Sequence, residues 1–201
     1  AAICHNVLVH PPGGLVGGDV LDVQVRVGPA AHGLVTTPGA TRFYRSEGDL
    51  AAQRVRLDVA AGARLEWLPL ETLYYSGCRA ENRLSMQLAP GAELMGWDIA
   101  ALGLPLADQP FVRGSVLQHL ELPGHWLERG EIAAQDERLL QSPLGLAGQR
   151  CLASLFFVSG APLDRTRRDA ALAAAREALA QHPLQASAGA TSPNPRVMVV
   201  R

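Results

Sequence analysis

Three acidic side chains stand at the borders of apolar segments, where a carboxylate either meets solvent or faces an internal cavity. Asp19 follows a pair of glycines, Asp98 follows a tryptophan, and Glu128 lies in the segment 126–129. An unpaired charge inside a cavity costs free energy that solvent would otherwise supply. Residue type alone therefore favours the solvated edge for all three.

A second group of residues could bind a soft metal ion. Cys4 and His5 are adjacent, and His10 follows within the same segment. Thiolate and imidazole both suit nickel, but a structural zinc site needs four ligands, usually in paired spacings. Because no second pair is present, residue type alone favours a buried cysteine with structural histidines over a metal site.

Two predicted loops stand out by composition, one rich in glycine and proline and the other rich in threonine and arginine. Residues 10–19 (HPPGGLVGGD) contain two prolines and four glycines, which predict a shaped loop that delivers Asp19 to the start of a strand. Residues 36–46 contain three threonines, a serine and two arginines beside Pro-Gly. The hydroxyls there, including that of Thr41, could line a hydrated passage, or the segment could be an ordinary turn.

Composition excludes several classes of function. All 18 basic residues are arginine, so a P-loop lysine, a Schiff-base lysine and a Ser-Lys pair are excluded. The net charge of −1 lacks the excess of positive charge that is typical of nucleic-acid-binding proteins. No GxSxG or HExxH motif occurs, so nothing supports an enzyme.

The same composition predicts a cytoplasmic protein. The three cysteines are far apart and form no CxxC pair, which indicates a reducing compartment. Neither a signal peptide nor an apolar run of about 18 residues is present, so we expect no membrane partner.

Strand signals dominate the first 160 residues. Segments 21–27, 54–59 and 83–88 alternate strictly between apolar and polar side chains, as half-buried strands do. Turn residues at positions 30, 62, 91 and 124 each precede another strand, and they recur at intervals of about 30 residues. This repeat predicts a mainly β fold, a solenoid-like (β-helix-like) stack of strands, with a β-sandwich as the alternative.

The C-terminal part changes character. Residues 152–158 predict a last strong strand, and Asp164 is suited to cap a helix that continues through 169–180. We expect a polar loop over 185–196 and a strand at 197–200. One or two α-helices near the C-terminus should then cover one face of the stack.

Five motifs in order resemble the urease accessory protein D family, called UreD or UreH. They are residues 10–19, 37–46, 65–69, 96–98 and 127–129, and they span nearly all of residues 4–160. The family pattern continues beyond both ends, so we expect residues 1–201 to be a single UreD-like domain without the family's N-terminal and C-terminal segments.

The resemblance implies a chaperone for nickel insertion into urease, not an enzyme. It implies a complex with urease accessory protein F, the GTPase accessory protein G and the urease apoprotein. No cofactor would be bound permanently, and nickel would be in transit through an internal passage. The passage-lining positions fall, by motif, on Asp19, Thr41, Asp98 and Glu128, with Asp19 facing the passage beside the other acids.

Two alternatives come from other classes. A β-solenoid hydrolase or carbohydrate-binding protein would pair its acids across a groove, roughly 5–10 Å apart. A purely structural adaptor would leave all metal contact to its partners.

Overall fold

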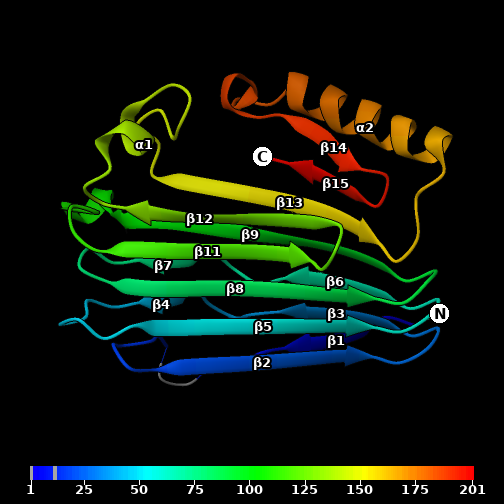
Figure 1. The fold of residues 1–201 in the computed structure, drawn as a ribbon, viewed down its shortest axis with the longest axis horizontal. Coiled ribbons are helices and arrows are strands. Elements are labelled where there is room, and N and C mark those ends of the chain that lie inside the picture. Colours follow the sequence, from blue (N-terminus) through cyan, green and yellow to red (C-terminus); the bar gives the residue numbers. More distant parts are fainter. Residues whose placement is uncertain (1, 11–12) are drawn as a thin grey trace.

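The computed structural model describes residues 2–10 and 13–201, and it is mainly β as predicted. Two sheets lie face to face as a solenoid-like stack (Figure 1). The smaller sheet has five strands in the order β12 (Trp126–Ala133), β11 (Ser115–Leu122), β8 (Arg79–Leu88), β5 (Ala51–Val59) and β2 (Val20–Val27).

The larger sheet has ten strands. Its main path is β1 (Cys4–Val7), β3 (His32–Thr36), β6 (Arg64–Leu68), β9 (Glu93–Leu104), β13 (Cys151–Ser159), β15 (Val197–Val200) and β14 (Ala190–Asn194). Off this path, β10 (Gln109–Pro110) pairs with β9, while β7 (Thr72–Tyr74) pairs with both β9 and β4 (Thr41–Phe43).

The strands predicted from alternation are confirmed by β2, β5 and β8, which run parallel in exact register. The turn positions are confirmed as well. Left-handed φ angles of 56°, 67°, 78° and 76° occur at Ala30, Gly62, Gly91 and Gly124. A left-handed residue is favourable for glycine and costly for alanine, so the same turn recurs at all four positions.

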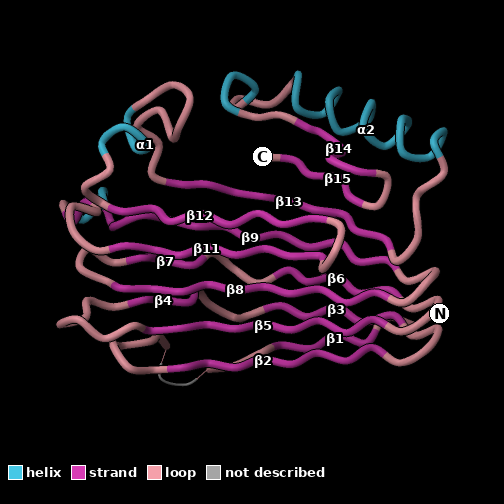
Figure 2. The backbone as a smooth tube through the Cα atoms, viewed as in Figure 1, coloured by secondary structure: helices cyan, strands magenta, loops and turns pink. Residues whose placement is uncertain are grey.

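The repeat itself holds for three units and is wrong for the fourth. The turns at Ala30, Gly62 and Gly91 each carry the chain from the smaller sheet to the larger one. The turn at Gly124 instead joins β11 to β12 as an antiparallel hairpin within the smaller sheet. From there on the larger sheet also grows by antiparallel pairing, through β13, β15 and β14 (Figure 2).

The C-terminal prediction is right for the helix and wrong for the loop. Helix α2 (Arg165–Ala180) begins at Asp164, whose carboxylate accepts hydrogen bonds from the amides of Thr166 and Arg167 at 2.9 and 3.1 Å. The segment 185–196 is not a loop throughout: it contains η2 (Gln185–Ser187) and strand β14. Its strand lacks apolar alternation because it is the outermost strand of the larger sheet, next to α2 (Figure 1).

Two shorter helical segments complete the fold. They are α1 (Glu137–Gln141) and η1 (Pro105–Ala107). Among the described residues, no helix combines the length and the apolar character needed to cross a membrane.

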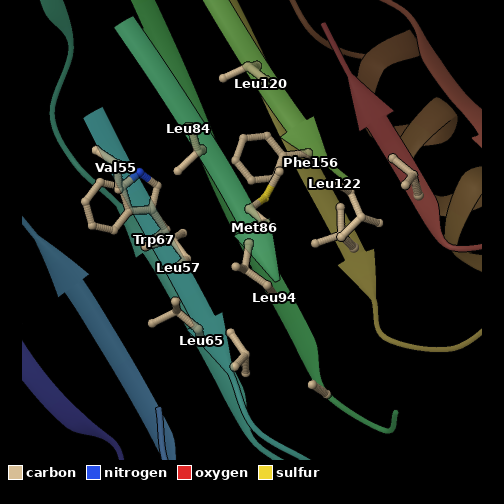
Figure 3. Close-up of a cluster of buried hydrophobic side chains, with 14 of the residues drawn as sticks. Val55, Leu57, Leu65, Trp67, Leu84, Met86, Leu94, Leu120, Leu122 and Phe156 are labelled. Carbon is tan, nitrogen blue, oxygen red and sulfur yellow. The ribbon is translucent and has the colours of Figure 1, made fainter. Parts of the chain in front are cut away.

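The space between the sheets contains two separate apolar clusters. The first includes Leu57, Leu65, Met86, Leu94 and Phe156, all fully buried (Figure 3). The second is centred on Phe43, Tyr74, Leu102 and Val116. Strands β5, β8, β9 and β11 supply buried residues to both clusters, so something other than strand order must separate the clusters along these strands.

Candidate functional site

A layer of polar side chains crosses the core between the two apolar clusters. On β5, Gln53 lies between Ala51 of the second cluster and Val55 of the first. Asn82 has the same place on β8, between Ala80 and Leu84. Because side chains alternate along a strand, both amides share the inward face with these apolar neighbours.

The register aligns these amides across the smaller sheet. Gln53 pairs with Asn82, and Asn82 pairs with Gln118 of β11. From the larger sheet, Asp98 of β9 and Ser154 of β13 lie opposite each other at the same level. We call this set the polar layer: Thr41, Gln53, Thr72, Asn82, Asp98, Gln118 and Ser154.

Hydrogen bonds connect five members of the polar layer, and both branches of this network end on Asp98. The Thr41 hydroxyl donates to the Gln53 carbonyl at 3.5 Å, and the Gln53 amide donates to the Asn82 carbonyl at 3.3 Å. The Asn82 amide then donates to Asp98 Oδ1 at 2.8 Å, and Gln118 Nε2 donates to Asp98 Oδ2. Both carboxylate oxygens of Asp98 therefore accept from fixed amide donors.

The surroundings of Asp98 favour the protonated, neutral carboxyl more than water does for an exposed aspartate. Burial raises the pKa of the carboxyl to about 6, although the hydrogen bonds from Asn82 and Gln118 lower it. The negative charge of Glu128 adds a smaller upward shift to the same pKa. A positive charge near Asp98, such as a bound cation, would offset the effects of both the burial and the Glu128 charge on this pKa.

Two adjoining cavities lead from the surface to Asp98. The outer one has a volume of about 140 Å³ and is lined in part by His10, Gly13 and Thr37. The inner one has a volume of about 20 Å³, room for about one water molecule, and is lined in part by Asn82, Asp98 and Thr72. Residues common to both linings are Thr41, Gln53, Val55, Trp67 and Pro69.

Glu128 lies on the other side of Asp98, toward the β12 edge. It shares the inward face of β12 with Trp126 and Ile132, and it is half-buried. Its carboxylate is paired with the guanidinium of Arg201. The Glu128 charge is close enough to Asp98 to raise the pKa of the Asp98 carboxyl slightly.

Asp19 does not reach the interior, so the expectation that it faces a passage beside the other acids is wrong for this structure. The residue is exposed, and Asp19 Oδ2 accepts a hydrogen bond from the Val16 amide at 2.9 Å. The Asp19 amide in turn donates to the Val16 carbonyl at 3.0 Å. Asp19 therefore closes the turn that leads into β2. The prolines of the same loop, Pro11 and Pro12, lie outside the described residues.

The soft-metal candidates are not gathered into a site. Cys4 and His5 are both exposed on β1, and as neighbours in a strand they point to opposite faces. His10 is half-buried and lines the outer cavity. Within the described residues, no three His, Cys, Asp or Glu side chains come together as a metal site.

Sequence reasoning missed Gln53, Asn82 and Gln118, the three amide side chains of the polar layer. A signal was present in the alternation: each amide occupies a position where the strand pattern calls for an apolar side chain. Gln53 and Asn82 are 29 residues apart, close to the interval of the turns. When polar residues recur at the interval of the repeat, at strand positions that otherwise hold inward apolar side chains, they indicate an internal polar layer.

The arrangement offers oxygen ligands without a closed cage. Thr41, Gln53, Asn82 and Asp98 provide hydroxyl, amide and carboxylate oxygens in sequence, starting at the outer cavity. Such ligands bind divalent cations more weakly than a cluster of thiolates and imidazoles does. The site is therefore suited to transient contact with a cation.

Comparison with known proteins agrees with the motifs. The family described as UreD urease accessory protein matches residues 1–201. The urease accessory protein UreD of Variovorax paradoxus (strain S110) is 68% identical over 200 residues, which cover 100% of this chain and 72% of that protein. The protein of the same name from Albidiferax ferrireducens is 69% identical over 198 residues, or 98% of this chain and 72% of the relative. The chain therefore belongs to the UreD family of urease accessory proteins.

Proposed function

We propose that the protein acts in urease maturation as a scaffold and conduit that passes nickel toward the urease active site. Membership of a family of urease accessory proteins supports the role in maturation. The observation that carries the conduit is the polar layer, a hydrogen-bonded row from Thr41 to Asp98 between two apolar clusters.

The physical case rests on the cost of a polar row inside a core. Each buried amide needs partners, and apolar side chains of similar size would fill the same positions without that need. Gln53 donates to Asn82, and Asn82 and Gln118 both donate to the Asp98 carboxylate, which is their common acceptor. A cation that approaches through the outer cavity would meet neutral oxygens first and a carboxylate last.

In this proposal nickel is cargo, and no cofactor is bound permanently. Thr41 lies where the two cavities meet, Asp98 is the inner carboxylate, and Glu128 follows it toward the β12 edge. Asp19 shapes the loop beside the outer cavity, to whose lining Gly13 of the same loop contributes. Cys4, His5 and His10 remain candidates for first contact, and His10 is the best placed because it lines the outer cavity.

The proposed partners are urease accessory proteins F and G and the urease apoprotein, in the cytoplasm. The protein would catalyse no reaction itself. The hydrolase alternative requires two acids across one groove, whereas Asp98 is the single carboxylate among the described residues that line these two cavities. This lining supports the conduit over a hydrolase.

The test is nickel loading of urease in cells that carry the complete set of urease and accessory genes. Asp98→Asn removes the inner charge and keeps the side-chain shape, while Asp22→Asn does the same at an exposed position of β2. We expect Asp98→Asn to lower the nickel content of purified urease by roughly tenfold, the effect of losing a charged contact. Asp22→Asn should leave it unchanged.

Co-purification with the partners separates the conduit from a purely structural adaptor. Asp98→Asn should assemble with the same partners as the wild type, because Asp98 lies inside the fold. Normal nickel loading in Asp98→Asn would contradict the conduit, and loss of assembly together with loading would favour the adaptor.

A further inference from the structure

Directly after β4 and β7, the surface has an open hollow that the proposed passage does not use. Its volume is about 540 Å³, and its lining includes Tyr44, Arg45, Tyr75, Ser76, Val112 and Arg113. We call it the Arg–Tyr hollow. It shares no described residue with the two cavities that lead to Asp98. The hollow is therefore a separate feature of the surface.

Backbone and hydroxyl hydrogen bonds fix the floor of the Arg–Tyr hollow. The Tyr75 amide donates to the Phe43 carbonyl at 3.0 Å, which extends the pairing of β4 with β7. Ser76 Oγ accepts hydrogen bonds from the amides of Val112 and Arg113, both at 3.2 Å. The segment that carries Arg113 is therefore tied to the turn after β7. A surface that is ordered before binding loses less conformational entropy when a partner binds.

Gly77 allows the Arg45 side chain to cross this turn. The φ angle of Gly77 is 86°, in the left-handed region, and a Cβ placed there would lie 2.8 Å from Arg45 Cγ. A larger residue would strain the backbone and collide with the aliphatic stem of Arg45. The stem thus packs closely against the turn, while the residue as a whole stays exposed.

The two guanidinium groups of the hollow have no internal counter-charge. Arg45 and Arg113 are exposed, and neither forms an ion pair with a carboxylate of the described residues. Arg54 and Arg64, by contrast, are each paired with a glutamate. Asp108 is the single carboxylate among the described residues of this lining. The excess of positive charge favours a ligand that carries carboxylates.

Two tyrosine rings and a valine add apolar surface to these charges. The ring centroids of Tyr44 and Tyr75 lie 5.1 Å apart, with the planes tilted by 39°. Val112, which lines the same hollow, is 59% exposed. A small inorganic anion would leave this apolar surface uncovered, whereas a peptide segment can cover it and present a carboxylate. Tyrosine and arginine are also enriched among the residues that dominate binding at protein interfaces.

We propose that the Arg–Tyr hollow is the docking site for an acidic segment of a partner protein in urease maturation, and that Arg45 and Arg113 bind its carboxylates. The inference rests on the proposed function and assigns a surface to one of its partners. Tyr44 is three residues from Thr41, about 10 Å along an extended chain. A partner docked there is next to the outer cavity, whose lining includes Thr41.

The test compares two double variants of the full chain. Arg45→Gln with Arg113→Gln removes both positive charges of the hollow. Arg26→Gln with Arg129→Gln is the matched control, because it removes two exposed positive charges from β2 and β12. The affinity of each purified protein for accessory protein F, for accessory protein G and for the urease apoprotein would be measured separately, at low and at physiological salt concentration.

For one of the three partners, we expect the hollow variant to bind at least tenfold more weakly than the wild type, because charged hydrogen bonds to carboxylates are lost. Its remaining affinity should also depend less on salt concentration. The control variant should bind all three partners as the wild type does. If the hollow variant fails to fold, Arg113→Gln alone becomes the deciding variant, with a loss of roughly threefold expected.

The other outcomes overturn the docking site, and they separate its failure from that of the proposed function. Unchanged affinity of the hollow variant for every partner that the wild type binds overturns the docking site alone. An equal loss in both double variants is a general charge effect and overturns it as well. Self-association of the wild type that only the hollow variant loses, with unchanged partner affinities, assigns the hollow to a second copy of the chain. A wild type that binds none of the three partners contradicts the proposed function itself.

Discussion

Gln53 and Val55 are two residues apart on β5, point to the same side, and lie in regions of the core with opposite chemistry. Val55 belongs to an apolar cluster that excludes water and stabilises the fold by burial. Gln53 belongs to the polar layer, where its side-chain amide accepts a hydrogen bond from Thr41 and donates one to Asn82. The comparison teaches that one strand of the repeat can place an apolar core residue and a hydrogen-bonded polar residue at neighbouring positions of the same face.

Breaking the apolar side of this comparison should have the largest effect on stability. Leu57 is 0% exposed in the first cluster, so Leu57→Ala should lower the free energy of unfolding by about 2–5 kcal/mol. Denaturant unfolding measures this loss. Val20→Ala, at an exposed position of β2, is the control and should change stability by less than about 0.5 kcal/mol. A loss from Leu57→Ala as small as the control's would show that this cluster is not the main source of stability.

Removing the charge of Asp98 in the polar layer should raise the free energy of unfolding, the opposite of the effect of Leu57→Ala. Because the folded pKa of Asp98 is raised to about 6, the ionised carboxylate destabilises the fold at neutral pH. Asp98→Asn should therefore raise the free energy of unfolding at pH 7.5 by about 1–2 kcal/mol: the shift of roughly two pKa units, reduced because the new amide has one oxygen and leaves one of the Asn82 and Gln118 donors without an acceptor. Under the proposed conduit we expect the same variant to lose nickel loading, so stability and nickel loading should change in opposite directions.

The pH dependence sharpens this prediction. Between about pH 4 and pH 6 the folded state retains a proton on Asp98 that the unfolded chain has released, so the contribution of Asp98 to stability falls as pH rises. The difference between Asp98→Asn and the wild type should be near zero at pH 4 and complete above pH 7. A difference that does not vary with pH would contradict the raised pKa.

A substitution of Glu128, which lies beside the polar layer on β12, should have the smallest effect on stability. Glu128 is half-buried and paired with Arg201, whose side chain is largely exposed. Exposed ion pairs contribute about 0–1 kcal/mol, so Glu128→Gln should change the unfolding midpoint little. Nickel loading should fall less than in Asp98→Asn. A loss of loading larger than that of Asp98→Asn would move the centre of the proposed passage to the β12 edge.

Local patterns predicted most of the stack. Alternation along β2, β5 and β8 and the turn residues at Gly62 and Gly91 are properties of short segments, and the structure confirms them. The hairpin at Gly124 was not predictable, because its turn resembles the others and its difference lies in which strand β12 pairs with. That choice depends on contacts distant in sequence.

The candidate site was predictable in part. Asp98, Glu128 and Thr41 were found through motifs, and the structure places Thr41 and Asp98 in one hydrogen-bond chain. Asp19 was misplaced because sequence does not show which way a turn carboxylate points. The amides were missed because each, taken alone, is an ordinary polar residue, and their meaning appears only when the strands are aligned.

The register of the parallel strands makes the polar layer modular. Neighbouring strands lie about 4.8 Å apart, so the amides of β5, β8 and β11 span about 10 Å, one step for each turn of the stack. The length of such a row is set by the number of neighbouring strands that contribute an inward amide. A chain with one more coil and one more inward amide at the same level would carry the row one step further without a new kind of interaction.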